Sequence, residues 1–299
     1  KDSRLRTGFN LHGTTSGRLS SSGKMNMQQI PRDNPIVKGC MRAAKGNKIV
    51  AMDLTTAEVY VAAVLAKDEN LMDVFRQGGN FHSTIAKLVF NLPCEAEDVA
   101  EHYSTQRQAA KAVTFGIMYG AGANKISQQV TADSGKNFSK GDAQEVIDDY
   151  FRQFHKLKKW IDHSSKYIMD NGFIYSQYGR KRRLPNVRSD NQGIQSHEVR
   201  SGLNFLVQSV ASDINLLGAI DTHNHIKSIN KTKEMRIFAL VHDSILAEVE
   251  ESYVDEYMEI VQKCIQKDRG IYIPGCPVGC DFDVGDDYSF GKFEKMYDI

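Results

Sequence analysis

The chain has 299 residues, of which 41% are hydrophobic and 25% are charged, a composition typical of a folded globular protein with a sizeable core. Its formal net charge is +1, so the strongly basic balance of many nucleic-acid-binding domains is missing. No uninterrupted apolar run approaches the roughly 18 to 20 residues of a membrane span, so no membrane partner is expected.

Five cysteines are scattered along the sequence without a CxxC pair: Cys40, Cys94, Cys264, Cys276 and Cys280. This pattern predicts free thiols in a reducing, cytosol-like compartment, and it supports neither a zinc site nor a disulfide framework. A bridge between Cys276 and Cys280 stays open as an alternative. Because the first residue is Lys1 and not Met, we expect the sequence to be part of a longer chain.

The chain opens with a segment that predicts little regular structure and then enters a strand. Residues 1–47 are rich in Gly, Ser and Asn, which favours extended loops and short strands. The apolar run that ends at Asp53 predicts a buried strand over 48–53, followed by a helix over 56–66.

A run of helices is predicted over residues 70–170, punctuated by Gly120-Ala121-Gly122 and by Gly135. A hairpin is predicted around 173–184, where an aromatic strand precedes four consecutive basic residues, Arg180-Lys181-Arg182-Arg183. A long helix over 194–222 completes this region.

The C-terminal part returns to strands. Residues 235–250 predict two apolar strands with His242-Asp243 at the turn, followed by a helix near 252–268 and a final strand pair over 270–285. The aspartate-bearing strands therefore flank a long helical insertion. We predict an α+β fold, an antiparallel sheet interrupted by a helical subdomain.

Two aspartates stand out because each ends or interrupts an apolar run, Asp53 after Ile49–Met52 and Asp243 after Ile237–His242. A carboxylate in such a setting costs several kcal/mol unless it is paired. The simplest shared partner is a divalent cation with oxygen ligands, Mg²⁺ or Mn²⁺, so the pattern predicts that the two carboxylates converge on two metal ions of a phosphoryl-transfer site. Two solvent-facing aspartates at strand ends are the alternative.

The residues after Asp53 allow two interpretations. Thr55 and Glu58 have the spacing of a capping box, in which Glu58 would be structural. Alternatively, the carbonyl of Leu54 lies beside the predicted cation, and the N-terminus of the following helix receives a phosphate.

Arg107, Lys111, Phe115 and Tyr119 recur every four residues and so line one helix face. Two like charges at this spacing repel each other, and a triphosphate would relieve the repulsion, while the aromatic rings would stack on a base. Gly116 and Gly120 are costly in a helix unless something approaches closely. A plain amphipathic helix is the alternative.

Two further groups suggest contacts with nucleic acid. Arg200, Asn204 and Gln208 also recur every four residues, and their donors suit the acceptors of a duplex minor groove. His82 begins a helix, where it would touch phosphate. A solvated helix face and a structural histidine are the respective alternatives.

Six segments, in order, resemble the motifs of DNA polymerase family A, the group of bacterial polymerase I and the T-odd phage replicases. The six segments are distributed along nearly the whole chain. They are Thr15–Ser21 with Asn26–Pro31 (TGRLSS…NLQNIP), Asp53–Glu58 (motif A, DYSQIE), Arg107–Gly120 (motif B, RRxxKxxNFGxxYG), Gly179–Pro185 (GRRRxxP), Arg200–Asp213 (RxxxNxxxQGTAAD) and Val241–Ser244 (motif C, VHDE).

The resemblance implies a right-hand polymerase fold and a role for each matched residue. Asp53 and Asp243 would hold two Mg²⁺ ions with the Leu54 carbonyl, and Lys111 would join them in catalysis. Glu58 would exclude the sugar 2′-hydroxyl, and Tyr119 would occupy the template-base position. The nucleotide would contact Arg107, Lys111, Phe115, Tyr119, His82, Glu58 and Thr56. Primer–template DNA would contact Arg18, Asn26, Gln28, Arg200, Asn204, Gln208 and His242.

The sequence also departs from the family pattern. Ser244 stands where the family usually has Glu, so a third carboxylate is missing from motif C. Gln108 and Thr114 replace the usual Arg and Asn of motif B, Thr55-Thr56 replaces Ser-Gln, and Tyr60 stands where Arg is common.

The resemblance implies a palm over residues 1–66 and 197–299 and fingers over 67–196, with thumb and exonuclease absent from this chain. It implies template-directed DNA synthesis, with primer–template DNA and dNTPs as partners. Further protein partners compatible with the resemblance are a processivity factor, or a separate chain that carries the thumb or exonuclease. The expected location is the cytoplasm of a bacterial or phage-infected cell. A catalytically retired DNA-binding replisome subunit and a single-subunit RNA polymerase are the rival functions.

Overall fold

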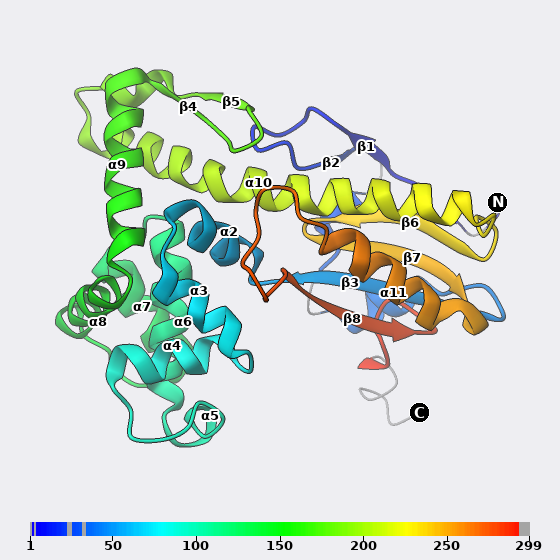
Figure 1. Ribbon diagram of the computed structural model, residues 1–299, viewed down its shortest axis with the longest axis horizontal. Coiled ribbons are helices and arrows are strands. Elements are labelled where there is room, and N and C mark those ends of the chain that lie inside the picture. Colours follow the sequence, from blue (N-terminus) through cyan, green and yellow to red (C-terminus); the bar gives the residue numbers. More distant parts are fainter. Residues whose placement is uncertain (1, 3, 23–25, 32–33, 293–299) are drawn as a thin grey trace. The chain divides into compact units, whose positions relative to one another are not determined.

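The computed structural model describes residues 2, 4–22, 26–31 and 34–292 (Figure 1). The chain forms two compact units. Unit 1 comprises Lys1–Ala57, Ala211–Gly270 and Pro277–Ile299, and unit 2 comprises Glu58–Val210 and Ile271–Cys276. Each unit has its own buried core.

Unit 1 is built on a four-stranded antiparallel sheet with the strand order β6-β7-β3-β8 (Figure 1). The strands are β3 (Asn47–Thr55), β6 (Met235–Val241), β7 (Ser244–Glu250) and β8 (Gly279–Gly285). β3 is an inner strand between β7 and β8, and its apolar residues are buried by the segments that cover the sheet. The predicted strand and the predicted turn at His242-Asp243 are both confirmed.

The two faces of this sheet are covered by different segments. Helix α11 (Val254–Ile265) packs on the sheet, and the C-terminal part of α10 (Gln192–Ser228) packs on α11 at Gly218, where a Cβ would lie 2.3 Å from Ile265 Cδ1. A cluster around Ala51 and Leu246 includes Met27 and the rings of Phe9, Tyr288 and Phe290. Smaller elements of unit 1 are β1 (Gly8–Asn10), β2 (Ser20–Ser22), η1 (Met27–Gln29), α1 (Pro35–Gly39) and η3 (Glu251–Tyr253).

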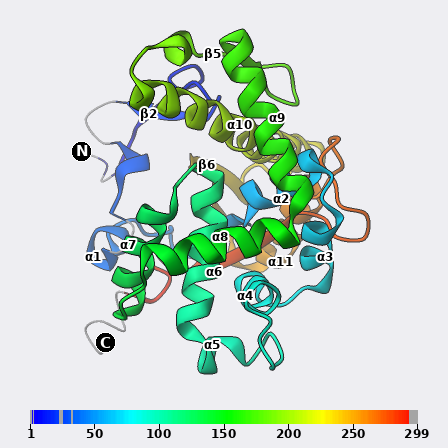
Figure 2. The ribbon, with the colours of Figure 1, turned by 90° about the vertical axis from the view of Figure 1, so that its left-hand side faces the viewer.

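Unit 2 is mainly helical, as predicted. Its helices are α2 (Ala57–Ala66), α3 (Glu69–Gln77), α4 (Phe81–Phe90), α5 (Val99–His102), α6 (Ser104–Met118), α7 (Ala123–Ser134), α8 (Lys140–Gln153) and α9 (His155–Asn171). Helix α6 packs against α4, α7 and α8 (Figure 2). Buried Asp68 joins α3 to α9, because its carboxylate accepts hydrogen bonds from the amides of Leu71 (3.2 Å) and Leu157 (2.8 Å).

A hairpin of β4 (Phe173–Tyr175) and β5 (Lys181–Arg183) follows α9, and the 3₁₀ turn η2 (Pro185–Arg188) leads into α10. The hairpin prediction is therefore confirmed. Its apolar side packs into a cluster with α9 and the N-terminal part of α10, through Ile168, Ile174, Leu184, Val187, Phe205 and Leu206.

Three predictions about the chain need comment. The predicted strand pair over 270–285 is wrong, because β8 pairs with β3 and residues 271–276 make only a bridge between Ile273 and Cys276. All five cysteines are free, which excludes the Cys276–Cys280 bridge here. Helix α10 has the length and composition of a membrane span, but 72% of its most apolar window is buried inside the protein, as in a core helix.

The palm and fingers boundaries stay a prediction. The compact units change at 57/58 and 210/211, near the predicted changes at 66/67 and 196/197. These units reflect packing, whereas palm and fingers are functional parts.

Candidate functional site

The backbone of unit 1 brings the two predicted metal-binding aspartates together, Asp53 on β3 and Asp243 in the turn between β6 and β7. Asp53 lies near the end of β3 and pairs with Ser244, the first residue of β7. The Leu54 amide donates a hydrogen bond to the Asp243 carbonyl across 3.3 Å. His242, which is exposed, has a φ of 54° and forms the tight turn with Asp243. The sheet therefore places two residues from opposite ends of the chain side by side.

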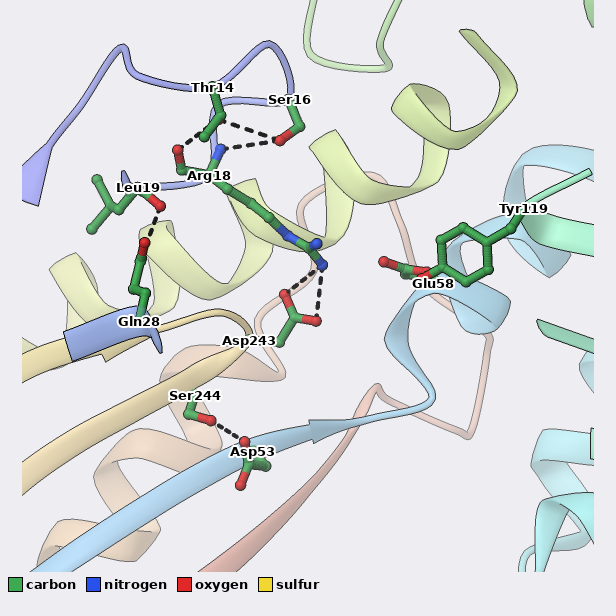
Figure 3. Close-up of polar contacts among 10 residues, drawn as sticks. All are labelled: Thr14, Ser16, Arg18, Leu19, Gln28, Asp53, Glu58, Tyr119, Asp243 and Ser244. Atoms are coloured by element: carbon green, nitrogen blue, oxygen red, sulfur yellow. Dashed lines mark hydrogen bonds and ion pairs between the residues drawn. The ribbon is translucent and has the colours of Figure 1, made fainter. Parts of the chain in front are cut away.

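The two carboxylates, however, point to different partners (Figure 3). Nη2 of Arg18 donates to both Oδ1 and Oδ2 of Asp243, at 3.0 Å each. The Ser244 hydroxyl donates to Oδ1 of Asp53. Each carboxylate is thus held by a partner of its own, and the convergence of the two carboxylates on shared ions stays a prediction.

The donors suit a hard divalent cation in their chemistry. Two carboxylates and the Leu54 carbonyl are oxygen ligands of the kind that Mg²⁺ and Mn²⁺ prefer. Asp243 already binds one positive charge, the guanidinium of Arg18. Across the described parts of the chain, no group of three or more His, Cys, Asp or Glu side chains is placed to hold a metal ion. Oδ2 of Asp53 has no hydrogen bond from Ser244, whereas both oxygens of Asp243 are contacted by Arg18, so a cation at Asp243 competes with a guanidinium.

Asp53 lines a cavity of about 360 Å³ on the Ala51 face of the sheet. Ser244 and Asp283 line it from the neighbouring strands, and Lys38 and Tyr288 line it from the segments that cover this face. The cavity gives the Asp53 carboxylate access to solvent.

The loop that carries Arg18 is held by side chains that were predicted to contact DNA. Gln28 Nε2 donates to the Leu19 carbonyl across 2.8 Å. The Asn26 side-chain oxygen accepts from the Gln28 amide at 3.0 Å and also from the Ser21 hydroxyl. Asn26 and Gln28 therefore shape the loop of Arg18, and their contact with DNA stays a prediction.

Unit 2 carries the predicted triphosphate-binding face. Arg107, Lys111 and Phe115 lie on α6, and His82 lies at the N-terminus of α4. Arg107 is anchored to that N-terminus, because its Nε donates to the Ser83 hydroxyl (3.2 Å) and its Nη2 to the side-chain oxygen of Asn80 (3.4 Å). Lys111 is exposed.

The His82 ring packs against Phe115, with 5.3 Å between the ring centroids. Burial, followed by the positive charges of Lys111 and Arg107, lowers the pKa of His82 from 6.5 to about 4. Its Nδ1 is buried without a hydrogen-bond partner. His82 is therefore neutral near pH 7 and offers a phosphate a neutral donor, while Arg107 and Lys111 offer the charge.

Glu58 is 8% exposed, and its carboxylate accepts a 2.5 Å hydrogen bond from the hydroxyl of Tyr119, which caps α6 (Figure 3). The capping-box alternative is wrong, because Thr55 is the last residue of β3 and its buried hydroxyl makes no hydrogen bond. Thr56 has a φ of 48° and redirects the chain from β3 into α2.

The close approach predicted at the motif B glycines is confirmed. Gly120 has a φ of 64°, and a Cβ there would lie 2.3 Å from Cγ of Arg200. At Gly116 the neighbour is Ile126. The approaching atoms belong to the protein, so these glycines explain how α6 packs and do not by themselves indicate a ligand.

Asn204 and Gln208, which recur with Arg200 every four residues along α10, are half-buried. The side-chain oxygen of Asn204 is buried without a hydrogen-bond partner, and Gln208 is similarly half-buried on the next turn. Leu206 and Val207 of the same helix are buried. Contact of this stripe with a minor groove stays a prediction.

Sequence reasoning missed three residues that hold the site. Ser244 was recognised only as a missing carboxylate, yet it binds Asp53. Asn80 and Ser83 position Arg107. The only available signal for the latter pair was the helix start at His82, because Asn is a favoured N-cap and α4 does begin after Asn80.

In a comparison with known proteins, residues 1–289 of the chain match the family model described as DNA polymerase family A. The chain is 50% identical to the DNA polymerase of Escherichia phage T5 over 99% of this chain and 37% of that protein. It is 28% identical to the thermostable DNA polymerase I of Thermus aquaticus over 97% of this chain and 33% of that protein. The chain therefore spans about a third of the length of these relatives.

The fold is similar to a solved structure described as the POL domain of Pol1 from M. smegmatis in complex with DNA primer-template and dNTP. The TM-score is 0.84 at 26% identity, and the match covers 97% of this chain and 49% of that one. The α+β architecture, an antiparallel sheet with a helical insertion, is thus that of a polymerase domain.

Proposed function

This chain belongs to DNA polymerase family A, and from that membership we propose that it performs template-directed DNA synthesis, joining dNTPs to the 3′-hydroxyl of a primer. The observation that carries the proposal is the placement of Asp53 on β3 beside the β6–β7 turn that holds Asp243, within a fold similar to a polymerase domain that was solved with DNA and dNTP. Residues 1–66 and 197–299 would form the palm, and residues 67–196 the fingers.

We propose Mg²⁺ as the cofactor, two ions held by Asp53, Asp243 and the Leu54 carbonyl, with Mn²⁺ as a substitute. When bound, the ions would supply activation of the primer hydroxyl and support for the leaving pyrophosphate. A metal ion at Asp243 would compete with Arg18 for the carboxylate and favour its release. Arg18, predicted to contact DNA, would then find its anionic partner in the primer–template.

The triphosphate is assigned to the α6 face of unit 2. Arg107 is held in place by Asn80 and Ser83, so less side-chain freedom is lost when it binds phosphate. Exposed Lys111 would stabilise negative charge on the phosphates during the reaction, which is its proposed catalytic role. Neutral His82 would add a hydrogen bond.

The base and sugar are assigned to the aromatic end of the same face and to motif A. Phe115 would pack on the nucleotide, and Tyr119 would act at the template-base position. Buried Glu58 would crowd the 2′ position and Thr56 would lie beside the nucleotide. The 2.5 Å bond between Tyr119 and Glu58 supports this assignment, because it fixes both side chains.

Primer extension by aspartate variants tests the proposal. We expect Asp53→Asn and Asp243→Asn to abolish extension with dNTPs and Mg²⁺ while binding to primer–template persists. Asp255→Asn, an exposed change on α11, is the matched control and should extend normally. Extension by either site variant at the wild-type rate would refute the metal assignment. DNA binding by the wild type without any extension would favour the retired-subunit alternative, and extension with NTPs alone would favour an RNA polymerase.

A further inference from the structure

Unit 2 has an open groove of about 380 Å³ that the proposed chemistry does not use. Residues of α9 and of the β4–β5 hairpin line it. These two elements follow each other in the chain and pack together (Figure 1). Leu65, Ile174 and Leu206 give it an apolar lining. Trp160, His163, Ser164 and Tyr167 line it from α9, and their spacing places them on one helix face.

Aromatic rings dominate this groove. Besides Trp160 it is lined by Tyr167 and Tyr175, which are 37% and 48% exposed. The ring of Phe173 packs edge-to-face against both tyrosines, with centroids 6.1 Å from Tyr167 and 5.6 Å from Tyr175. The exposed rings are therefore held in position by a neighbour and lose little freedom if they bind a flat ligand.

Positive charge lies beside the aromatic rings. The Lys181 ammonium lies 3.8 Å from the centre of the Phe173 ring and 5.4 Å from that of Tyr175. Exposed Lys159 and Lys166 directly precede Trp160 and Tyr167. Of the described residues that line the groove, none is acidic. On α9, Asp162 is already paired with Lys158 at 2.5 Å.

We propose that this groove binds single-stranded DNA, with bases stacked on the Trp160, Tyr167 and Tyr175 rings and phosphates beside Lys159, Lys166 and Lys181. Rings beside a cationic track are the general solution for unpaired strands, because every base has a face that can stack. A duplex hides those faces and does not fit a cavity of this size. The inference rests on the proposed polymerase function and extends it, since a primed template contains an unpaired strand.

Trp160 supplies the probe, because it is the only tryptophan in the 299-residue sequence. We expect oligo(dT) to quench its fluorescence in a saturable manner, and added salt to weaken this binding. The measurement involves no synthesis and should give the same result with Asp243→Asn. Failure of the groove is thus distinguishable from failure of the polymerase assignment.

Two variants in the groove and two matched controls locate the binding. Tyr175→Ala should weaken oligo(dT) binding about 5- to 100-fold, as expected when one base loses its stacking partner. Lys181→Glu should weaken it and lower the slope of log K against log salt by about 0.7 for each phosphate that is no longer neutralised. Tyr272→Ala and Lys140→Glu, likewise exposed positions outside the groove, should bind as the wild type does.

Three DNA forms identify which unpaired strand binds. Quenching by a primer–template with a 5′ template overhang, or by a nicked duplex with a 5′ flap, supports the proposal and names the source of the strand. Equal quenching by a blunt duplex overturns it. Absence of quenching by oligo(dT), or equal binding by Tyr175→Ala, Lys181→Glu and their controls, also overturns it.

Discussion

The contact between Arg18 and Asp243 predicts that the chain restrains its own metal binding. Arg18 contacts both oxygens of the Asp243 carboxylate at 3.0 Å, so the guanidinium competes with any ion that uses this carboxylate. Arg18→Ala removes the competitor and also one positive charge beside the site. Both effects have the same sign, and we expect the variant to bind Mn²⁺ more tightly in the absence of DNA.

The size of the effect follows from the burial of the pair. The side chains of Arg18 and Asp243 are 23% and 30% exposed, so the contact is neither a surface ion pair nor a fully desolvated one. Hydrogen bonds to charged groups in such positions contribute about 1.5–3 kcal/mol. At about 1.4 kcal/mol per factor of ten, the Mn²⁺ affinity of Arg18→Ala should rise roughly 10- to 100-fold.

Calorimetric titration of the DNA-free protein with Mn²⁺ measures this change directly. Arg6→Ala is the matched control, because Arg6 carries the same charge in the same N-terminal segment but pairs with Asp2. The double variant Arg18→Ala, Asp243→Asn should lose the gain. Unchanged or weaker Mn²⁺ binding by Arg18→Ala would refute the reasoning. An equal gain in Arg6→Ala would show that net charge, and not the contact, is responsible.

Three further outcomes are expected. The pKa of His82 is lowered to about 4 in the folded protein, whereas the unfolded imidazole binds its proton near 6.5. The free energy of unfolding should therefore fall as the pH drops from 6.5 toward 4. Thermal melting of His82→Gln should show a smaller loss of stability over this range. Tyr60→Phe should lower the free energy of unfolding by about 1–3 kcal/mol, because the buried hydroxyl bonds the Cys276 carbonyl and the Ile273 amide; an unchanged denaturation midpoint would contradict this. Glu58→Ala should admit ribonucleotides in a competition assay, and unchanged discrimination would count against its place beside the sugar.

Elements with a strong local signal were predicted well from the sequence. The apolar run of β3, the turn at His242-Asp243 and the helical face of Arg107 needed only periodicity and turn chemistry. The final strand pair failed because strand pairing is a tertiary property. Residues 279–285 found their partner in β3, more than two hundred residues away in the sequence.

Side-chain partners could not be predicted for the same reason. Arg18 lies 225 residues from Asp243, and Ser244 lies 191 residues from Asp53. A motif match assigns each residue a place in the fold. The side-chain rotamer of an aspartate, however, depends on which hydrogen-bond donor the fold brings close to its carboxylate. The sequence therefore predicted that Asp53 and Asp243 lie near each other in the fold and not the partners of their carboxylates.

The serine at position 244 can be understood from the row of residues across the sheet. Ser244 and Asp281 both pair with Asp53, one on each side, so the three side chains share one face. Two like charges directly opposite each other destabilise a sheet, and a glutamate at 244 would place a third beside them. Burial and then the charge of Asp53 already raise the pKa of Tyr288 on this side of the sheet. The Ser244 hydroxyl instead donates a hydrogen bond to Asp53. Beside Asp53 the sheet thus holds a hydroxyl on β7 and a carboxylate on β8, so the second acidic group of this row comes from Asp281.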